Sequence, residues 1–436
     1  MLYGDTPLEL ELGPDVMLPL ALLALLFAIG VPVWISLGLS SLLMLWMTGI
    51  LPLSLLGESL FSGIDAFALI AIPLYLLTGD ALVRSGLSDK LLNIAEATAG
   101  SLRTGLGSST VLGCGFFACI SGSDAAGCAA VGRITHKHLV ERGYPPAYAA
   151  ALIAAGACTG ILIPPSIAYI ILGMVLGVPV TSLFVAAAIP GVLVLLAIML
   201  TNVLINRLSG FENSAARFSF RRWLAALWDG KFALAIPAII LGGIYTGIFT
   251  PTEAAAVAVV VTVGIGFMTG SLERRDIPRM LETSAKVNGV IVPIIAVALP
   301  LAQALALVEL PQAFADMITS YTDDSTMIVL LMLAVFLAAG CFMEATPNIV
   351  ILGPIMFPLA SQIGMDQLQF CVFMITALGI GFITPPLGLN LFVIAGVSGQ
   401  PILKIARYAL PYVMSLILVV LLIAFVPSLS LWAFQE

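Results

Sequence analysis

The sequence has little charge and few of the side chains that enzymes use for catalysis. Charged residues make up 9% of its 436 residues, compared with about a quarter in soluble globular proteins. The two histidines, His136 and His138, flank Lys137, and we expect a solvated basic face there and not a ligand pair. Residues 1–16 contain no Lys or Arg, so the basic region of a cleavable signal peptide is missing and we expect the first apolar helix to be retained.

Several sequence motifs are also missing. The chain has no HExxH, GxSxG or CxxC motif and no Walker loop. These absences exclude the common metalloprotease, hydrolase and redox sites, and they mean that the chain cannot power transport by hydrolysing ATP itself. The six cysteines lie in apolar or hairpin-like segments, and we interpret them as packing residues. We therefore expect no enzymatic activity, no catalytic residues, no organic cofactor, no transition metal and no nucleic-acid partner.

Long apolar runs dominate the sequence. Hydrophobic residues make up 61% of the chain and the mean hydropathy is +1.14. Hydrocarbon offers no partners to backbone amides, so spanning segments are helices of roughly 20 residues or strands of a closed barrel, and the continuous runs favour helices. The sequence predicts an all-α polytopic membrane protein in a lipid bilayer, with spans near residues 17–37, 38–55, 66–84, 146–178, 182–206, 232–250, 252–270, 288–308, 369–398 and 408–433.

Two further apolar stretches are each interrupted by a polar cluster. They are 105–132, interrupted by SGSDAAG at 121–127, and 325–358, interrupted by MEATPN at 343–348. If each enters and returns on the same side as a re-entrant helical hairpin, every Lys- and Arg-rich connection lies in the cytoplasm and every acid-dominated one lies outside. The charge pattern therefore favours two hairpins, with both chain termini outside.

This topology makes the two halves inverted repeats. Five Gly and Pro positions recur at a constant offset of 221 residues: Gly132 and Gly353, Gly160 and Gly381, Pro164 and Pro385, Pro165 and Pro386, and Pro190 and Pro411. The chain is predicted to begin with an external N-terminus (1–16), and its two repeats are joined by a cytoplasmic linker (207–231) whose aromatic residues suggest an interfacial helix. The first repeat (17–206) consists of scaffold helices 17–84, an arm 86–104, an inner hairpin 105–132, a broken helix 146–178 and a final helix 182–206. The second repeat (232–436) consists of scaffold helices 232–308, an arm 309–323, an outer hairpin 325–358, a broken helix 369–398 and a final helix 408–433.

The two predicted broken helices each contain a double proline. TGILIPPS contains Pro164 and Pro165, and GFITPPLG contains Pro385 and Pro386. Proline removes an amide donor and clashes with the preceding turn, which frees carbonyl groups, and glycine lets the backbone leave helical geometry. Paired broken helices in inverted repeats are typical of secondary transporters, whose site near the bilayer midplane uses freed carbonyls to coordinate Na⁺.

The hairpin tips supply further candidate ligands. Hydroxyl oxygens of Ser121 and Ser123 suit a hard monovalent cation, and the half-helix N-termini at the same tips suit a substrate carboxylate. An acid at membrane depth costs about 3 kcal/mol on insertion scales, so Asp124 and Glu344 are either ion ligands or proton carriers, or else N-caps neutralised by amide donors.

Two charged residues have a simpler interpretation. We expect Glu253, with help from Thr252, to cap the helix that follows Pro251. We expect Arg133 to mark the inner membrane surface and not a substrate site.

At these motifs the sequence resembles the large membrane (M) subunit of the tripartite ATP-independent periplasmic (TRAP) transporters, which belong to the ion-transporter superfamily. The resemblance covers essentially the whole chain in order and spacing. It rests on the segments GVPVWISLG, IPLYLLTGDALVRSGLSDKLL, SGSDAAGCAAVG, RGYPPAYAAAL, GILIPPSIAYIILG, IPGVL, GIFTPTEAAAVA, MEATPNIVILGPIMFPLA and GFITPPLGLNLFVIAG.

The resemblance implies an elevator-type symporter that imports small organic acid anions with two or more Na⁺ ions across the bacterial inner membrane. It also implies two partners, a small four-helix membrane subunit and a periplasmic substrate-binding protein. Carried over onto this sequence, the family's Na⁺ sites lie at Ser121, Gly122, Ser123, Gly160, Thr346 and Thr384, with Gly381 at the repeat position of Gly160. The chain departs from the family pattern at Asp124, where the family usually has a second serine.

We assign the substrate site to the remaining positions around the tips and breaks: Asp124, Thr159, Pro164, Pro165, Ser166, Asn348, Pro385, Pro386 and Asn390. No arginine lies at either tip to indicate a dicarboxylate clamp, so sialic acid, C4-dicarboxylates and keto acids all stay open. The alternative function is a self-sufficient anion symporter or exchanger of the same architecture that needs no binding protein.

Overall fold

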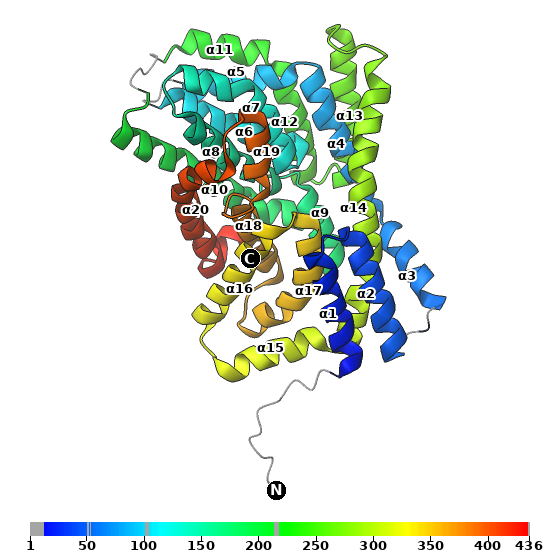
Figure 1. Ribbon diagram of the computed structural model, residues 1–436. Helices are drawn as coiled ribbons and strands as arrows, with labels where there is room; N and C mark the ends of the chain where they lie inside the picture. The colour runs from blue at the N-terminus through cyan, green and yellow to red at the C-terminus, as the bar shows by residue number, and fades with distance from the viewer. Residues whose placement is uncertain (1–12, 50–51, 53, 101–103, 213–217, 435–436) are drawn as a thin grey trace.

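The computed structural model describes residues 13–49, 52, 54–100, 104–212 and 218–434 (Figure 1). Every regular element among these residues is a helix, which confirms the predicted all-α class. Six of the described helices are long and apolar enough to cross a membrane, or seven if one bent pair counts as a single span. Most of the predicted external N-terminus lies outside the described residues, as do residues 213–217 of the predicted linker.

The first half of the chain contains helices over the residues that were predicted as scaffold, arm, hairpin, broken helix and final helix. Its elements are α1 (Pro14–Ala28), α2 (Val33–Thr48), α3 (Ser54–Ile64), the 3-10 helix η1 (Phe67–Ile70), α4 (Ala71–Arg84), α5 (Leu87–Ala99), α6 (Gly105–Ser121), α7 (Asp124–Glu141), α8 (Pro146–Ala157), the 3-10 helix η2 (Cys158–Ile161), α9 (Ile167–Leu176) and α10 (Val180–Ser209).

The second half follows the linker helix α11 (Phe220–Asp229). Its elements are α12 (Lys231–Tyr245), α13 (Pro251–Met268), α14 (Asp276–Leu307), α15 (Leu310–Tyr321), α16 (Ser325–Phe342), α17 (Ala345–Gln362), α18 (Gln367–Gly381), α19 (Leu389–Ser398), α20 (Ile402–Phe425) and the short α21 (Ser428–Leu431).

Helices of the first half correspond to helices of the second half at the same offset of 221 residues as the Gly and Pro positions. Adding 221 to 124 and 141, the bounds of α7, gives 345 and 362, which are the bounds of α17. Adding 221 to 146, the first residue of α8, gives 367, the first residue of α18. A duplicated architecture explains this agreement, because unrelated halves would not share the lengths of their connections.

One helix of the scaffold differs between the halves. Shifting residues 54–84 by 221 gives 275–305, the region of the uninterrupted helix α14. In the first half the equivalent helix breaks after Ile64, so α3 is a separate element that the predicted span 66–84 omits. Helix α14 begins at Asp276 and not near 288, because a helix needs no hydrocarbon around its polar first turns.

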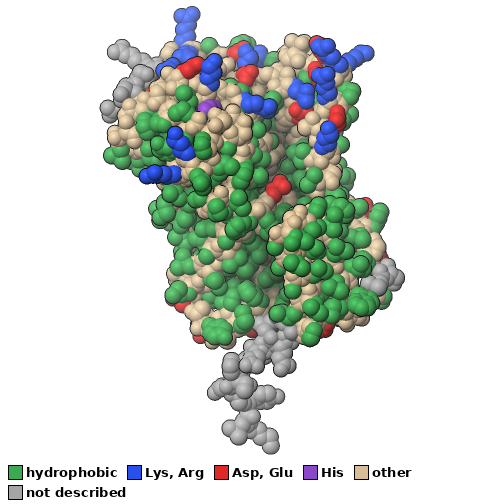
Figure 2. Space-filling model, in the orientation of Figure 1, with side chains coloured by type: hydrophobic (Ala, Val, Ile, Leu, Met, Phe, Trp, Pro, Cys, Tyr) green, Lys and Arg blue, Asp and Glu red, His purple; other side chains and the backbone are tan. Residues whose placement is uncertain are grey.

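The two predicted hairpins lie in opposite halves of the molecule (Figure 1). Helices α5, α6 and α7 lie toward the same end as α11, and α15, α16 and α17 lie toward the other end. Lys and Arg side chains gather at the α11 end (Figure 2). That this end faces the cytoplasm stays a prediction of the positive-inside rule. The re-entrant path of each pair stays a prediction. Of the four helices in the two pairs, only α16 has the length and composition of a membrane span.

The broken helices of the two halves contact each other in the core. The thiol of Cys158 donates to the carbonyl oxygen of Gly379 at 3.2 Å, and these residues are separated by 221 positions. Each of them therefore touches its own repeat equivalent. A contact of this kind is expected where a pseudo-twofold axis relates two inverted repeats, so that residues near both breaks can face one site.

The linker contains a helix where its aromatic residues suggested one. In α11 the side chains of Phe220, Leu224 and Trp228 are exposed and recur every fourth residue, so they form one apolar face. Arg222 forms an ion pair with Glu96 of the arm at 3.1 Å. An amphipathic helix docked by its polar side suits a position at the membrane surface.

Glu253 has the structural role that the sequence suggested, but its partner differs. Thr250 is the N-cap of α13, and the two residues form a capping box: Thr250 N donates to Glu253 Oε2 at 2.8 Å, and Glu253 N donates to Thr250 Oγ1 at 3.3 Å. Thr252, which we expected to help, instead donates to the carbonyl oxygen of Phe67 at 3.2 Å.

We expect Thr250→Ala to lower the free energy of unfolding by about 1 kcal/mol, because the first amides of α13 lose their acceptor. The measurement is the thermal unfolding midpoint of the purified protein in detergent. Thr48→Ala is the control, because Thr48 Oγ1 only donates to Met44 O within its own helix. Equal midpoints for the two variants would contradict the capping role.

Candidate functional site

The first hairpin tip is a sharp turn between α6 and α7. Gly122 ends α6 with φ of 60°, a conformation that glycine adopts without a Cβ clash. Ser123 is the N-cap of α7, and its Oγ accepts from Ala126 N at 3.4 Å. Asp124 is the first residue of α7 and is therefore not the N-cap, which removes one of the two roles open to it.

This tip packs directly on the first broken helix. The carbonyl oxygen of Gly122 accepts from Ile167 N at 3.3 Å. A Cβ at Gly122 would lie 2.8 Å from the carbonyl oxygen of Pro165. On the other side of the break, a Cβ at Gly160 would lie 2.6 Å from the amide nitrogen of Asp124. Two glycines thus bring three backbone segments into contact around the tip.

The break between α8 and α9 consists of η2 and the double proline. Thr159 Oγ1 donates to Gly156 O, and Ser166 Oγ donates to Ile161 O, both at 2.7 Å. These hydroxyl groups satisfy carbonyl oxygens that helix unwinding would leave open, and both side chains are fully buried. Their own oxygen atoms keep lone pairs that can accept from or coordinate a ligand.

The second tip joins α16 to α17. Asn348 Nδ2 donates to Ala339 O and to Met343 O, each at 3.1 Å, so the amide ties the end of α16 to the first turn of α17. Glu344 occupies the N-cap position of α17, but its side chain makes no capping hydrogen bond. An N-cap role for the Glu344 carboxylate is therefore wrong.

The second broken helix packs on α16. A Cβ at Gly381 would lie 2.7 Å from the backbone of Gly340. The carbonyl oxygen of Thr384 accepts from the thiol of Cys341 at 3.2 Å. Thr384 and Gly381 thus form a cluster with the end of α16. Pro386, in the same break, is exposed.

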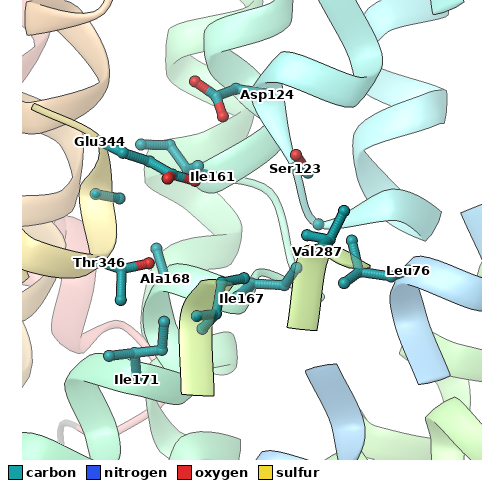
Figure 3. A pocket seen from close by; sticks show the side chains of 13 residues that line it. Leu76, Ser123, Asp124, Ile161, Ile167, Ala168, Ile171, Val287, Glu344 and Thr346 are labelled. Carbon is teal, nitrogen blue, oxygen red and sulfur yellow. The ribbon is translucent and has the colours of Figure 1, made fainter. Parts of the chain in front are cut away.

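The two tips meet at a cavity of about 50 Å³ (Figure 3). This volume exceeds the roughly 10–15 Å³ that one water molecule needs, so an ion with some of its water fits. Figure 3 shows Glu344 and Thr346 on one side and Leu76 and Val287 on the other. Four predicted site residues line the cavity: Gly122, Ser123, Asp124 and Thr346.

The other predicted residues lie elsewhere. Gly160 supports the tip from behind. Ser121 lines a neighbouring cavity. Ten further predicted residues also do not line the tip cavity: Thr159, Pro164, Pro165, Ser166, Asn348, Gly381, Thr384, Pro385, Pro386 and Asn390. The structure thus brings one predicted set to the shared cavity and leaves a second, around Thr384 and Gly381, as a separate cluster.

The lining of the tip cavity is acidic. Asp124 is 5% exposed, and its Oδ2 has no hydrogen-bond partner in the described part of the chain. Glu344 is exposed and lines the same cavity. No Lys, Arg or His is among the described residues that line it. A buried carboxylate oxygen without a partner costs about 1–3 kcal/mol or more, and a bound cation would offset that cost.

Asn390 connects the two halves beside the first tip. Its Nδ2 donates to Ala154 O at 3.5 Å, its backbone oxygen accepts from the thiol of Cys128 at 3.6 Å, and its Oδ1 has no partner in the described part of the chain. The buried amide therefore contacts both α8 and α7 of the first half from the start of α19.

One wall of the tip cavity was not predicted from the sequence. Leu76 of α4 and Val287 and Ile291 of α14 lie on it. An apolar residue in a membrane helix has the same sequence signal whether it faces lipid, the core or a cavity. No motif could have identified these three residues.

Comparison with known proteins gives one family. Residues 20–429 match the tripartite ATP-independent periplasmic transporter family, DctM component. The chain is 35% identical over 410 residues to the isethionate TRAP transporter permease protein DctMQ of Oleidesulfovibrio alaskensis, covering 94% of this chain and 65% of that protein. It is 37% identical over 397 residues to the C4-dicarboxylate TRAP transporter large permease protein DctM of Pseudomonas aeruginosa, covering 91% and 93%.

Among solved structures, the YdaH transporter of Alcanivorax borkumensis is similar in fold. The TM-score is 0.58 at 16% identity, and the match covers 88% of this chain and 89% of that chain. At this identity the similarity describes the fold alone.

Proposed function

Because the chain belongs to the DctM family of tripartite ATP-independent periplasmic transporters, we propose that it is a Na⁺-coupled importer of small organic acid anions in a bacterial inner membrane. It works with a small membrane subunit and a periplasmic substrate-binding protein, and both of its termini lie in the periplasm. The observation that carries this proposal is the acidic cavity at which the tips of both halves meet.

The charge of this cavity sets an order of binding. An anion about 4 Å from one carboxylate is repelled by roughly 4 kcal/mol at an effective dielectric constant of 20. Asp124 and Glu344 both line the cavity, so an organic anion enters favourably only after cations have neutralised them. Coupling then follows from electrostatics, because the anion binds favourably only while Na⁺ occupies the cavity.

The proposed movement is an elevator, in which the hairpins, the broken helices and the final helix of each half slide against the scaffold. The scaffold side of the tip cavity supports this proposal, because it is built from the apolar side chains of Leu76, Val287 and Ile291. An apolar wall makes no hydrogen bonds that would have to break during a slide. The Na⁺ ligands on the moving side would be Ser123, Thr346 and the backbone carbonyl groups around both breaks.

The partners are proposed from the family and from one relative. This chain spans 65% of the length of the DctMQ protein. We propose that the remaining part of that relative corresponds to the small membrane subunit, which this chain would recruit as a separate protein. The identity of the transported acid would then be set mainly by the binding protein.

The proposal is tested by transport in proteoliposomes that contain this chain with its small subunit, with the binding protein added outside. The radiolabelled probes are succinate, isethionate, pyruvate and N-acetylneuraminate. Two Na⁺ with one monovalent anion carry one net positive charge, so a membrane potential that is negative inside drives uptake by about 2.3 kcal/mol per 100 mV. We expect uptake of at least one acid, and we expect it to stop when choline replaces Na⁺.

Three outcomes decide between mechanisms. Equal uptake in Na⁺ and in choline would exclude sodium coupling. Uptake that is unaffected by omitting the binding protein would indicate a self-sufficient symporter. The absence of uptake for every probe would contradict the proposed function itself.

A further inference from the structure

A second cavity lies next to the tip cavity. Its volume is about 190 Å³. It shares Leu76 and Val287 with the tip cavity, and Ser121 at the end of α6 lies on its wall. A ligand that leaves the tip cavity past these residues would enter this second space.

The second cavity extends from the tips toward the basic end of the molecule. On α4 its wall runs to Val83, next to Arg84, and on α7 it runs from Ala126 to Arg133. On α14 it includes Thr283, one turn from Arg279. On each of these helices the wall runs toward the end of the molecule where Lys and Arg gather, and the charge pattern predicts that this end is cytoplasmic.

Arg133 is the one basic side chain on the described wall of this cavity. Its Nε donates to Ala129 O at 3.2 Å, which fixes the side chain along its own helix. It forms no ion pair within the described part of the chain. The acid on the same wall, Asp80, is paired with Arg84 at 2.9 Å and so does not neutralise Arg133.

The three hydroxyl groups of the wall already donate to carbonyl oxygens, and Ser121 Oγ donates to Ser123 O at 3.4 Å. Ser284 Oγ donates to Pro73 O at 2.8 Å, and Thr283 Oγ1 donates to Arg279 O at 2.9 Å. Most of the remaining wall is apolar, and the side chain of Arg133 is exposed and so open to a ligand from the cytoplasmic side. Arg133 is therefore the one cationic donor on the described wall, and its terminal nitrogen atoms make no hydrogen bond or ion pair within the described part of the chain.

We propose that this cavity is an exit subsite in which Arg133 binds the anionic group of the substrate after it leaves the tip cavity. The proposal rests on the proposed function and assigns Arg133 a role beyond marking the inner surface. The acidic tip cavity repels the anion once Na⁺ dissociates, and the guanidinium offers it the nearest opposite charge on the cytoplasmic side.

The test measures inhibition of uptake by substrate inside the vesicle. Proteoliposomes are loaded with increasing concentrations of the acid that the wild type takes up, and the initial rate of Na⁺-driven uptake is measured with the binding protein outside. We expect Arg133→Gln to raise the internal half-inhibitory concentration about tenfold, the loss expected for a charged hydrogen bond. The external half-saturating concentration should not change, and Arg133→Lys should be intermediate.

Lys137→Gln is the matched control. Lys137 is a basic residue one turn further along α7, exposed and paired with Glu141, and it does not line the cavity. The exit subsite would be overturned if Arg133→Gln left the internal half-inhibitory concentration unchanged. It would also be overturned if the variant raised the external half-saturating concentration by the same factor. We expect the same result in vesicles of phosphatidylcholine alone. A shift seen only with phosphatidylglycerol would assign Arg133 to lipid binding and would also overturn the exit subsite. Failure of wild-type uptake would instead contradict the proposed function.

Discussion

Gly160→Ala is expected to reduce Na⁺-driven uptake by about 100-fold, the scale of loss that a 1 Å displacement of a binding group produces. The added Cβ would lie 2.6 Å from the amide nitrogen and 2.7 Å from the Cα of Asp124, and 2.8 Å from the carbonyl carbon of Ser123. All three are backbone atoms and cannot turn aside as a side chain could. The first tip must therefore move away from the first break, which separates the proposed Na⁺ ligands.

The measurements are the initial rate of uptake and the thermal unfolding midpoint of the same preparation. Overpacking of this kind also costs about 1–3 kcal/mol of stability, so the midpoint should fall while the protein stays monodisperse. The control is Gly264→Ala in α13, where a Cβ would meet nothing within 4 Å. Alanine in a helix interior is favoured over glycine, so this variant should unfold no lower than the wild type and transport normally.

A second glycine separates a local effect from general misfolding. Gly381 is the repeat equivalent of Gly160, and a Cβ there would lie 2.7 Å from Gly340 and not near the first tip. If Gly160→Ala kept normal uptake and normal Na⁺ dependence, the tip and the break would not need their close contact, and the proposed ion site would be misplaced. If Gly381→Ala lost Na⁺ stimulation as well, the cluster in the second half would be a second ion site.

The sequence was sufficient to locate the turning points of the fold. Gly122, the double prolines and the offset of 221 residues are local signals, because glycine and proline act on the backbone of their own segment. The agreement of α7 with α17 under that offset shows that such signals also carry long-range information when a chain is duplicated.

The sequence was not sufficient to say which tip residues share a cavity. Ser121 and Ser123 are two positions apart on either side of the turn at Gly122, yet they line different cavities. Thr346 and Thr384 were predicted as ligands alike, but only Thr346 reaches the shared cavity. The relative placement of the two halves decides this, and it depends on packing contacts such as Cys158 with Gly379 that no local pattern encodes.

Asp124→Asn is expected to shift Na⁺ affinity and stability in opposite directions. Asp124 is 5% exposed and has an oxygen atom without a partner in the described part of the chain. If its carboxylate is a cation ligand, removing the charge should weaken Na⁺ binding at least about tenfold, or about 1.4 kcal/mol. Without Na⁺, however, the variant should unfold at a higher temperature than the wild type, because the cost of burying an unpaired charge disappears.

The measurement is the unfolding midpoint as a function of NaCl at constant ionic strength with choline chloride. A ligand that binds only the folded state raises stability by RT ln(1 + [L]/Kd), so the curve for each variant gives its Kd for Na⁺. Asp323→Asn, the same chemical change at an exposed residue far from the tips, should reproduce the wild-type curve. Glu344→Gln should lie between them, since Glu344 lines the cavity but is exposed, and exposure screens its charge. If the curve for Asp124→Asn coincided with that of the wild type, Na⁺ would bind without this carboxylate. If wild-type uptake instead followed an imposed pH gradient, Asp124 would be assigned to proton transfer.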